Sequence, residues 1–231
     1  MNWDNHLVIK PKWNGEIVNK EKKLELAKKV AAMVKEGQVI GFGSGSTSFL
    51  AIGEIAKRME DENLHITAIP TSKEVEMVCH YLSIPTTNLL EQKPDWNFDG
   101  ADEVDEKKNL IKGRGAAMFQ EKLVMSCSKE RYILIDESKR VKVLGEKFAV
   151  PVEIYSNSMN FVKQELLKLG AKEVTLRLAK MKDGPVITEN GNVILDTKFD
   201  IIEEDLEKKI KEITGVIESG LFIGYDVTVI S

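Results

Sequence analysis

The sequence predicts an α/β protein in two parts, a mostly parallel sheet covered by helices on both faces and a smaller α+β domain. Up to about residue 147, short apolar segments alternate with amphipathic segments of helical period, the pattern of parallel strands joined by crossover helices. From residue 148 the order becomes strand, helix, strand, strand, helix, strand, which is the split βαβ order of a ferredoxin-like module. We therefore place the domains at 1–147 plus 220–231 and at 148–219, with 1–20 as an N-terminal extension.

Each element of the first part has a local signal. The apolar stripe of Leu24, Ala27, Val30 and Val34 predicts a helix that Gly37 ends. The other segments follow the same alternation of buried strands and amphipathic helices. Predicted strands are 39–42, 65–70, 96–98 and 132–135, and predicted helices are 21–36, 49–59, 72–82 and 116–126. Residues 1–20 have no steady period, and we expect an arm that docks on the body or on a partner chain.

The second part of the sequence contains a clear turn signal. Asn190-Gly191 lies between the apolar residues 186–187 and 193–195 of the segment 186–196 and predicts a hairpin with a type I′ turn. Around it we expect strands and helices of ordinary length. The strands are 150–155, 173–178 and 215–222, the helices are 159–169 and 203–213, and 225–230 returns to the first sheet as a last strand.

The net charge, the cysteines and the length of the apolar runs argue against several classes of protein. The chain has 231 residues with 33 Lys+Arg and 37 Asp+Glu, a net charge of −4 without a basic cluster, which argues against nucleic-acid binding. Cys79 and Cys127 lie in apolar helical patterns and are read as small buried residues rather than a disulfide or a nucleophile. No run is long enough to span a bilayer, and the first residues resemble no signal peptide. We expect a soluble cytoplasmic protein with no membrane or nucleic-acid partner.

The stretch 99–122 holds the strongest chemical signal. Carboxylates stand on a glycine turn at residues 99–103, a lysine stands on a second glycine bend at 112–115, and the following helix carries Glu121. Glu121 lies about 9 Å along the helix from Gly115. Such a set suits proton transfer on a polar, anionic substrate. The alternatives are a solvated turn and, for Glu121, an i,i+4 partner on a wet helix face.

The glycine loop 41–47, GFGSGST, lies between a strand and a helix. Its backbone N–H groups and the helix dipole can hold a phosphate. It lacks the third glycine of a dinucleotide fingerprint and the Gly-Lys-Ser/Thr of a Walker A loop. A small phosphorylated ligand therefore fits better than a nucleotide, and the alternative is a glycine turn with a Ser or Thr N-cap.

The sequence contains one apparent metal-binding pattern, which its surroundings contradict. Asp95, Asn97, Asp99, Gly100 and Glu106 match the EF-hand calcium pattern. Pro94 would stop the incoming helix, however, and glycines interrupt the exit helix. The three histidines are scattered, so no zinc pattern is present. We predict no metal and no cofactor.

Taken together, GFGSGST, DGADEVD, KGRGAAMFQEK and IDESKR resemble the signature set of the A-type ribose-5-phosphate isomerase family. The resemblance runs from about residue 23 to the end. It implies a Rossmann-like domain with a second, ferredoxin-like α+β domain, in a homodimer or homotetramer. It also implies metal-independent interconversion of ribose 5-phosphate and ribulose 5-phosphate through an enediolate, a step of the pentose phosphate pathway.

The resemblance also implies roles for individual residues. The general base falls on Glu121, Lys112 would stabilise the enediolate oxygen, and Asp99 and Asp102 would accept hydroxyl protons and help to open the ring. Lys23 matches a basic residue that reaches the phosphate. The substrate-binding positions fall on three loops and one further contact: Ser44, Gly45, Ser46 and Thr47; Asp99, Gly100, Ala101 and Asp102; Lys112, Gly113, Arg114 and Gly115; and Lys139.

Two positions depart from the family pattern. Arg114 replaces the middle glycine of a Lys-Gly-Gly-Gly bend and would be strained there if the position needs positive φ. Gln120 stands where an arginine is common. The rival functions are an isomerase of another sugar phosphate and a non-catalytic sugar-phosphate sensor like the effector domains of some bacterial repressors. Such a sensor should carry an N-terminal helix-turn-helix, for which residues 1–20 are too short.

Overall fold

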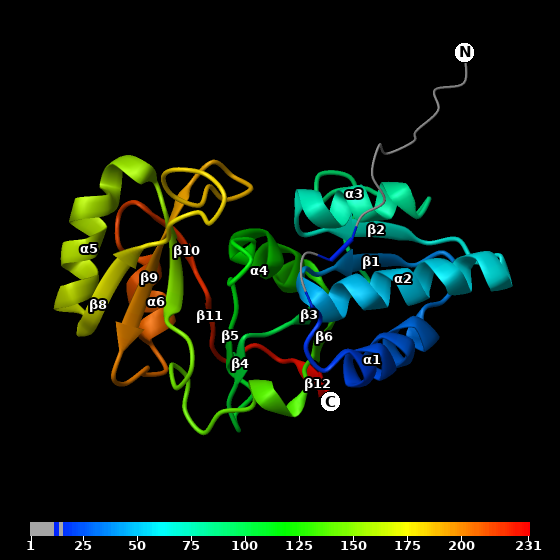
Figure 1. Cartoon of the computed structure of the whole chain (residues 1–231), viewed down its shortest axis with the longest axis horizontal. Coiled ribbons are helices and arrows are strands. Elements are labelled where there is room, and N and C mark those ends of the chain that lie inside the picture. Colours follow the sequence, from blue (N-terminus) through cyan, green and yellow to red (C-terminus); the bar gives the residue numbers. More distant parts are fainter. Residues whose placement is uncertain (1–11, 14–15) are drawn as a thin grey trace, which may run out of the picture. The chain divides into compact units, whose positions relative to one another are not determined.

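The structure is a computed structural model that describes residues 12–13 and 16–231, and it confirms the predicted α/β class. It forms two compact units (Figure 1). The first contains the described residues up to Gly100 together with Leu123–Glu137 and Val227–Ser231, and the second contains Ala101–Lys122 and Ser138–Asp226. The domain limits at residues 148 and 220 differ from this division and stay a prediction.

The first unit is built on a parallel sheet, as predicted. Its strands are β1 (Val39–Phe42), β2 (Thr67–Pro70), β3 (Trp96–Gly100), β6 (Glu130–Leu134) and β12 (Thr228–Ile230). The order is β12-β6-β3-β1-β2, and every pairing is parallel. The chain leaves β1 toward β2 on one side, whereas β3 leads to β6 on the other. The carboxyl ends of β1 and β3 therefore form a topological switch point, the usual ligand position in open α/β sheets.

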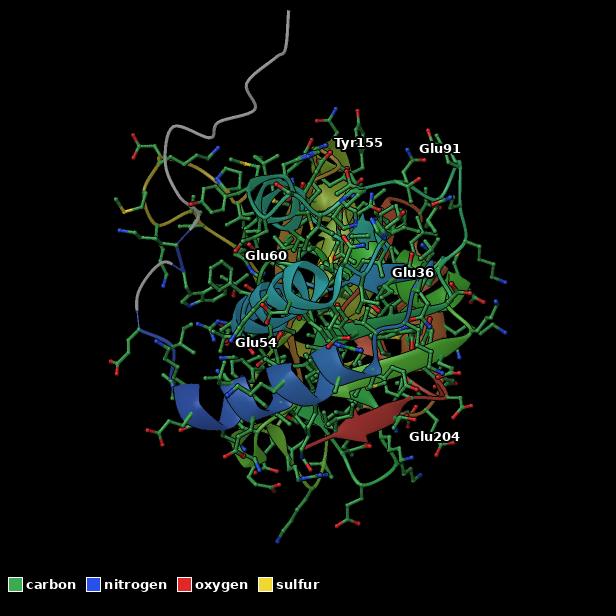
Figure 2. All side chains as sticks on the ribbon, turned by 90° about the vertical axis from the view of Figure 1, so that its right-hand side faces the viewer. Glu36, Glu54, Glu60, Glu91, Tyr155 and Glu204 are labelled. Carbon is green, nitrogen blue, oxygen red and sulfur yellow. The ribbon has the colours of Figure 1, made fainter. Side chains whose placement is uncertain are left out.

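Helices cover both faces of this sheet. On one face α1 (Lys20–Met33) and α2 (Gly45–Glu62) lie side by side (Figure 1), and their buried residues share one core with α3 (Lys73–Tyr81) and with Ile40, Phe42 and Phe98. Side chains alternate along a strand, so Gly41 and Asn97 face the other side, where they meet Val124 of α4 (Met118–Cys127). Glu60 lies exposed on α2 (Figure 2).

The predicted N-terminal arm falls largely on residues outside the described ones. Within the described part, the Trp13 ring lies 5.9 Å from the Phe49 ring of α2, centroid to centroid. Docking of the arm on the body is therefore confirmed at this one point.

The second unit contains the predicted ferredoxin-like module. Its elements are β7 (Val150–Ile154), α5 (Met159–Lys168), β8 (Ala171–Leu176), β9 (Val193–Phe199), α6 (Leu206–Lys211) and β10 (Val216–Ser219). The sheet order is β10-β7-β9-β8, and all pairings are antiparallel. Val152, Ile154 and Leu195 enter the core shared with α5 and α6.

Three local predictions need correction. The strand expected over 215–222 is split at Gly220 into β10 and β11 (Leu221–Phe222), and β11 joins β4 (Glu103–Val104) and β5 (Leu110–Ile111) in a separate three-stranded sheet. The turn at Asn190-Gly191 is not type I′, because Gly191 has φ +77° while Asn190 is not among the residues with positive φ. A type I turn followed by a left-handed glycine explains this geometry. In addition, β9 is the only arm of that hairpin that is a strand in the described structure.

Two further expectations concern cysteines and membranes. Cys79 is fully buried, and burial raises the pKa of its thiol to about 12, so the prediction of a small buried residue is confirmed there. Cys127 is half-buried, and both thiols are free. Among residues 12–13 and 16–231, every helix is too short or too polar to cross a bilayer.

Candidate active site

The ends of β1 and β3 approach each other closely in the first unit. Phe42 pairs with Phe98, so Gly43 comes directly beside Asp99, and the Gly43 N–H donates to the Phe98 carbonyl at 2.9 Å. A Cβ on Gly43 would lie 2.2 Å from Asp99 Cγ. The glycine is therefore needed for the close approach, and Asp99 is buried at the switch point with 1% of its surface exposed.

Gly43→Ala should lower the free energy of unfolding by about 1–3 kcal/mol, the usual effect of overpacking. Gly53 is a matched control, because it lies inside α2 with open space around its Cα. Gly53→Ala should raise stability by up to about 1 kcal/mol, since alanine favours a helix interior. Urea unfolding of the two variants measures both effects, and an equally stable Gly43→Ala protein would contradict the packing argument.

The glycine loop ends in the first turn of α2. The helix begins at Gly45, earlier than the predicted residue 49, and Ser44 is its N-cap residue. First-turn N–H groups have no partner inside the helix, so residues 45–47 present donors at the positive end of the helix dipole. Lys23 adds a cation, because its Nζ donates to Ser46 Oγ at 3.0 Å and lies 3.9 Å from Asp136 Oδ2. This geometry suits a phosphate group.

The β4–β5 hairpin places two predicted residues next to each other in the second unit. Glu103 pairs with Ile111, and one step further the Asp102 N–H donates to the Ile111 carbonyl at 2.8 Å. Asp102 and Lys112 thus leave adjacent strand ends. Glu103 itself is fully buried and accepts hydrogen bonds from the backbone N–H groups of Gly145 at 2.7 Å and Phe148 at 2.7 Å. Its carboxylate therefore stabilises the loop over residues 145–148.

The glycine bend after β5 resolves the question about Arg114. Positive φ occurs at Gly113 (+107°) and Ala116 (+68°), whereas Arg114 is not among the positive-φ residues. Arginine is therefore not strained at this position by the backbone. Its N–H donates to Asp102 Oδ2 at 3.1 Å, and its side chain and Gly115 are exposed.

Glu121 and Lys112 form a buried ion pair. Glu121 Oε2 lies 3.2 Å from Lys112 Nζ, and the two side chains are only 5% and 3% exposed. The Lys112 ammonium also lies 5.7 Å from the centroid of the Phe222 ring. The wet-face alternative for Glu121 is therefore wrong. A carboxylate can accept a proton here, and the neighbouring ammonium can pair with a developing oxyanion.

The Asp102 carboxyl lies near the same charged groups. Burial raises the pKa of its carboxyl, and this effect outweighs the opposing influences of the Arg114 N–H, Lys112 and Lys139, with Glu121 adding to the rise. Asp102, Lys112, Arg114, Glu121 and Lys139 therefore lie together in the second unit, together with Ala101, Gly113 and Gly115. Ser44, Gly45, Ser46, Thr47, Asp99 and Gly100 lie in the first.

The calcium pattern falls on a strand. Asn97 and Asp99 belong to β3 within the parallel sheet, so the helix–loop–helix that an EF-hand requires is not formed there. In the part of the chain that the structure describes, His, Cys, Asp and Glu form no group of three suited to a metal ion.

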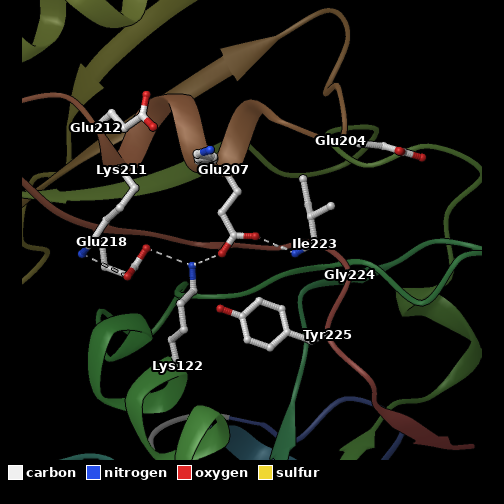
Figure 3. Close-up of a pocket in the computed structure, with 10 residues that line it drawn as sticks. Lys122, Glu204, Glu207, Lys211, Glu212, Glu218, Ile223, Gly224 and Tyr225 are labelled. Carbon is white, nitrogen blue, oxygen red and sulfur yellow. Dashed lines mark hydrogen bonds and ion pairs between the residues drawn. The ribbon is translucent and has the colours of Figure 1, made fainter.

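Sequence reasoning missed two sets of contacts around the glycine bend and α4. Arg177 pairs with Asp196 and donates to the carbonyls of the bend. Lys122 donates to Glu207 at 2.6 Å and to Glu218 at 2.9 Å beside an open pocket of about 630 Å³ (Figure 3). Arg177 follows a strand end and Lys122 follows Glu121, and neither position alone signals a partner far along the chain.

The fold and these clusters define an α/β protein whose buried carboxylate–lysine pair suits acid–base chemistry. The family model of ribose 5-phosphate isomerase A (phosphoriboisomerase A) matches residues 67–231. The chain is 45% identical over 210 residues to ribose-5-phosphate isomerase A of Methanocaldococcus jannaschii, which covers 90% of this chain and 92% of the relative. The chain belongs to the ribose 5-phosphate isomerase A family.

Other relatives agree. The Synechococcus sp. ribose-5-phosphate isomerase A is 44% identical over 206 residues, 87% of this chain and 88% of the relative. The solved structure of the Methanocaldococcus jannaschii protein has a TM-score of 0.88 at 44% identity and covers 91% of this chain and 95% of that one. A D-ribose-5-phosphate isomerase in complex with phospho-erythronic acid has a TM-score of 0.87 at 36% identity, with 91% and 94% covered.

Proposed function

We propose that this chain interconverts D-ribose 5-phosphate and D-ribulose 5-phosphate, with Glu121 as the base that moves the proton. The observation that carries this proposal is the buried Glu121–Lys112 pair, at 3.2 Å, in a member of the ribose 5-phosphate isomerase A family. The related enzyme solved with phospho-erythronic acid supports a phosphorylated sugar derivative as ligand.

The proposed reaction transfers one proton within the open-chain sugar. Glu121 removes the proton from C2, the electron pair of that C–H bond forms the C1–C2 double bond, and the π pair of the C1 carbonyl moves onto O1 to give the enediolate. The protonated Glu121 then returns the proton to C1 while the hydroxyl proton of O2 passes to O1, so that C2 becomes the carbonyl of the ketose. Lys112 stabilises the negative oxygen during this transfer, and Asp99 and Asp102 accept hydroxyl protons during ring opening and the exchange between the two oxygens.

The phosphate group is assigned to the start of α2. Residues 44–47 offer backbone N–H groups and hydroxyls, and Lys23 supplies positive charge next to Ser46. The remaining binding positions are assigned as the resemblance implies: Gly100, Ala101, Gly113, Arg114, Gly115 and Lys139. For the assembly and location, we propose a homodimer or homotetramer in the cytoplasm.

A direct assay tests the activity. The purified chain is incubated with ribose 5-phosphate in the presence of EDTA, and ribulose 5-phosphate is followed over time. We expect turnover that EDTA does not reduce. Absence of turnover, or turnover restricted to another sugar phosphate, would contradict the proposed substrate, and loss of turnover in EDTA would contradict the metal-independent mechanism.

Lys112→Ala should reduce kcat by about 100-fold, or about 3 kcal/mol, because an oxyanion contact matters most in the transition state. KM should change much less. Lys107→Ala is the control, since Lys107 is 71% exposed in a surface pair with Glu204. Steady-state kinetics of both variants measure the effect, and a Lys112→Ala change confined to KM would argue against an oxyanion role.

A further inference from the structure

Arg177 lies directly after β8, on the face of the second unit's sheet that Ile194 and Asp196 share. Its backbone N–H donates to the Ile194 carbonyl at 2.9 Å. Its guanidinium forms a bidentate pair with Asp196, with Nε at 2.9 Å from Oδ2 and Nη2 donating to Oδ1. A bidentate arginine–carboxylate pair fixes the plane of the guanidinium. The Arg177 side chain is only 16% exposed, so its orientation is well defined.

The remaining amino group of Arg177 reaches the glycine bend. Nη1 donates to the Gly113 carbonyl at 2.8 Å and to the Arg114 carbonyl at 3.1 Å. A single side chain thus holds two consecutive carbonyl groups of a segment more than 60 residues away in the sequence. Lysine could not replace it, because an ammonium lacks the planar fork that serves a carboxylate and two carbonyls together.

These contacts set the direction of one peptide group. In a trans peptide the C=O of one residue and the N–H of the next point in opposite directions. With the Gly113 carbonyl turned toward Arg177, the Arg114 N–H must point away from it, and there it donates to Asp102 Oδ2 at 3.1 Å. Arg177 and Asp102 are therefore linked through the 113–114 peptide group, which hydrogen-bonds to Arg177 on one side and to Asp102 on the other.

The backbone conformation of the bend also depends on contacts from outside the bend. Gly113 has φ +107°, and Ala116 has φ +68°, a left-handed conformation that is unfavourable for a residue with a Cβ. Lys112 precedes this segment and Glu121 follows it, so a change in the bend would alter the 3.2 Å ion pair. The far end is held as well, because Gln120 Nε2 donates to Asn190 Oδ1 at 3.0 Å.

We propose that Arg177, fixed by Asp196, is a positioning residue for the isomerisation. It orients the 113–114 peptide so that the Arg114 N–H points to Asp102, and it keeps the Lys112 ammonium within ion-pair distance of Glu121. Its effect on rate rests on the proposed function, whereas its effect on the bend does not.

The variants are chosen to separate orientation from charge. Arg177→Met removes the donors and keeps an apolar stem, and Arg177→Lys keeps the charge without the fork. Lys198→Met is the matched control, because Lys198 forms the exposed 2.7 Å pair with Glu173 across the same two strands, β8 and β9. Each variant is assayed for kcat and KM with ribose 5-phosphate at a temperature at which urea unfolding shows it to be fully folded.

We expect Arg177→Met to reduce kcat by about 10-fold to 100-fold, the effect of a small misplacement of catalytic groups. KM should change less than kcat, Arg177→Lys should recover little of the loss, and Lys198→Met should match the wild type. A wild-type kcat in Arg177→Met, or full recovery in Arg177→Lys, would overturn the proposal.

Hydrogen exchange of the backbone amides in residues 112–118 gives a readout that does not depend on activity. The Arg114 amide should exchange faster in Arg177→Met than in Lys198→Met or the wild type, because its bond to Asp102 is lost. Unchanged exchange would overturn the positioning role. If exchange accelerates as expected but the wild type does not turn over ribose 5-phosphate, the proposed function fails while the hold on the bend stands.

Discussion

Glu121→Gln is expected to reduce kcat for ribose 5-phosphate by about 10²- to 10⁴-fold, the range for loss of a general acid–base group. The amide has nearly the shape of the carboxylate but cannot accept the proton from C2. Because the side chain is buried beside Lys112, water has little access to substitute for it. Binding of the sugar phosphate should change far less than the rate.

Exchange with solvent provides a second measurement of the same step. A proton held by a carboxylate between its removal from C2 and its return to C1 can exchange with water, so the wild type should incorporate deuterium from D₂O into the sugar. Glu121→Gln should lose incorporation and turnover together. Retained incorporation in this variant would assign the base to another residue.

Glu218→Gln is the matched control for Glu121→Gln. Glu218 is also a buried glutamate paired with a lysine in the second unit, at 2.9 Å from Lys122. Its replacement should lower stability while leaving kcat of the folded protein nearly unchanged. Equal losses of kcat in both variants would point to a general effect of disturbing a buried carboxylate rather than to catalysis by Glu121.

The fold could be predicted because its main elements have strong local patterns. The segments 39–42 and 150–155 are short, mostly apolar runs typical of buried strands, and the stripe of α1 is long enough to establish a helical period. The three-stranded sheet could not be predicted, since β4, β5 and β11 have two residues each and a pair of residues has no period. Its pairing depends on the contact of Gly220 with Lys112 and Pro151, a long-range effect.

The site was predicted less completely than the fold. Glu121, Lys112 and Asp102 could be chosen because they lie in one stretch of sequence and resemble family motifs. Residue type alone does not distinguish Asp102 from Glu103. In the structure Glu103 is wholly buried and accepts backbone N–H groups, whereas Asp102 precedes β4 and is only half-buried. Arg177 was missed for a related reason, because its partners are brought to it only by the folded sheet.

Lys122→Met should lower the free energy of unfolding by about 3–5 kcal/mol, the usual result of removing one partner from a buried ion pair. The Lys122 ammonium donates to Glu207, Glu218 and the Leu221 carbonyl, at 2.6, 2.9 and 2.6 Å. It also lies 4.6 Å from the centroid of the Phe222 ring. Figure 3 shows it between the two carboxylates. Without it, two negative charges remain close together in a buried place.

Burial distinguishes the Lys122–Glu207 pair from a surface pair with the same N–O distance. Lys107 Nζ also lies 2.6 Å from its partner, Glu204, but these side chains are 71% and 79% exposed, against 6% and 16% for Lys122 and Glu207. Lys107→Met should therefore change stability by less than about 1 kcal/mol. Similar losses in the free energy of unfolding for Lys107→Met and Lys122→Met would show that the N–O distance, rather than burial, determines how much an ion pair stabilises the fold.

The pH dependence of the loss gives the sharpest test of the Lys122 network. Burial raises the pKa of the Glu218 carboxyl, but the Lys122 charge, the Ser219 N–H and Lys211 outweigh this, so its pKa lies below the ordinary value. A lowered pKa stabilises the folded state above the unfolded-state pKa, and this stabilisation disappears as the pH falls through the folded-state pKa. The difference between wild type and Lys122→Met in urea unfolding should therefore be largest near neutral pH and shrink in acid, because protonated Glu218 no longer needs a cation. A difference that is constant across this range would mean that Lys122 stabilises the fold through the Leu221 carbonyl and the Phe222 ring rather than through the carboxylates.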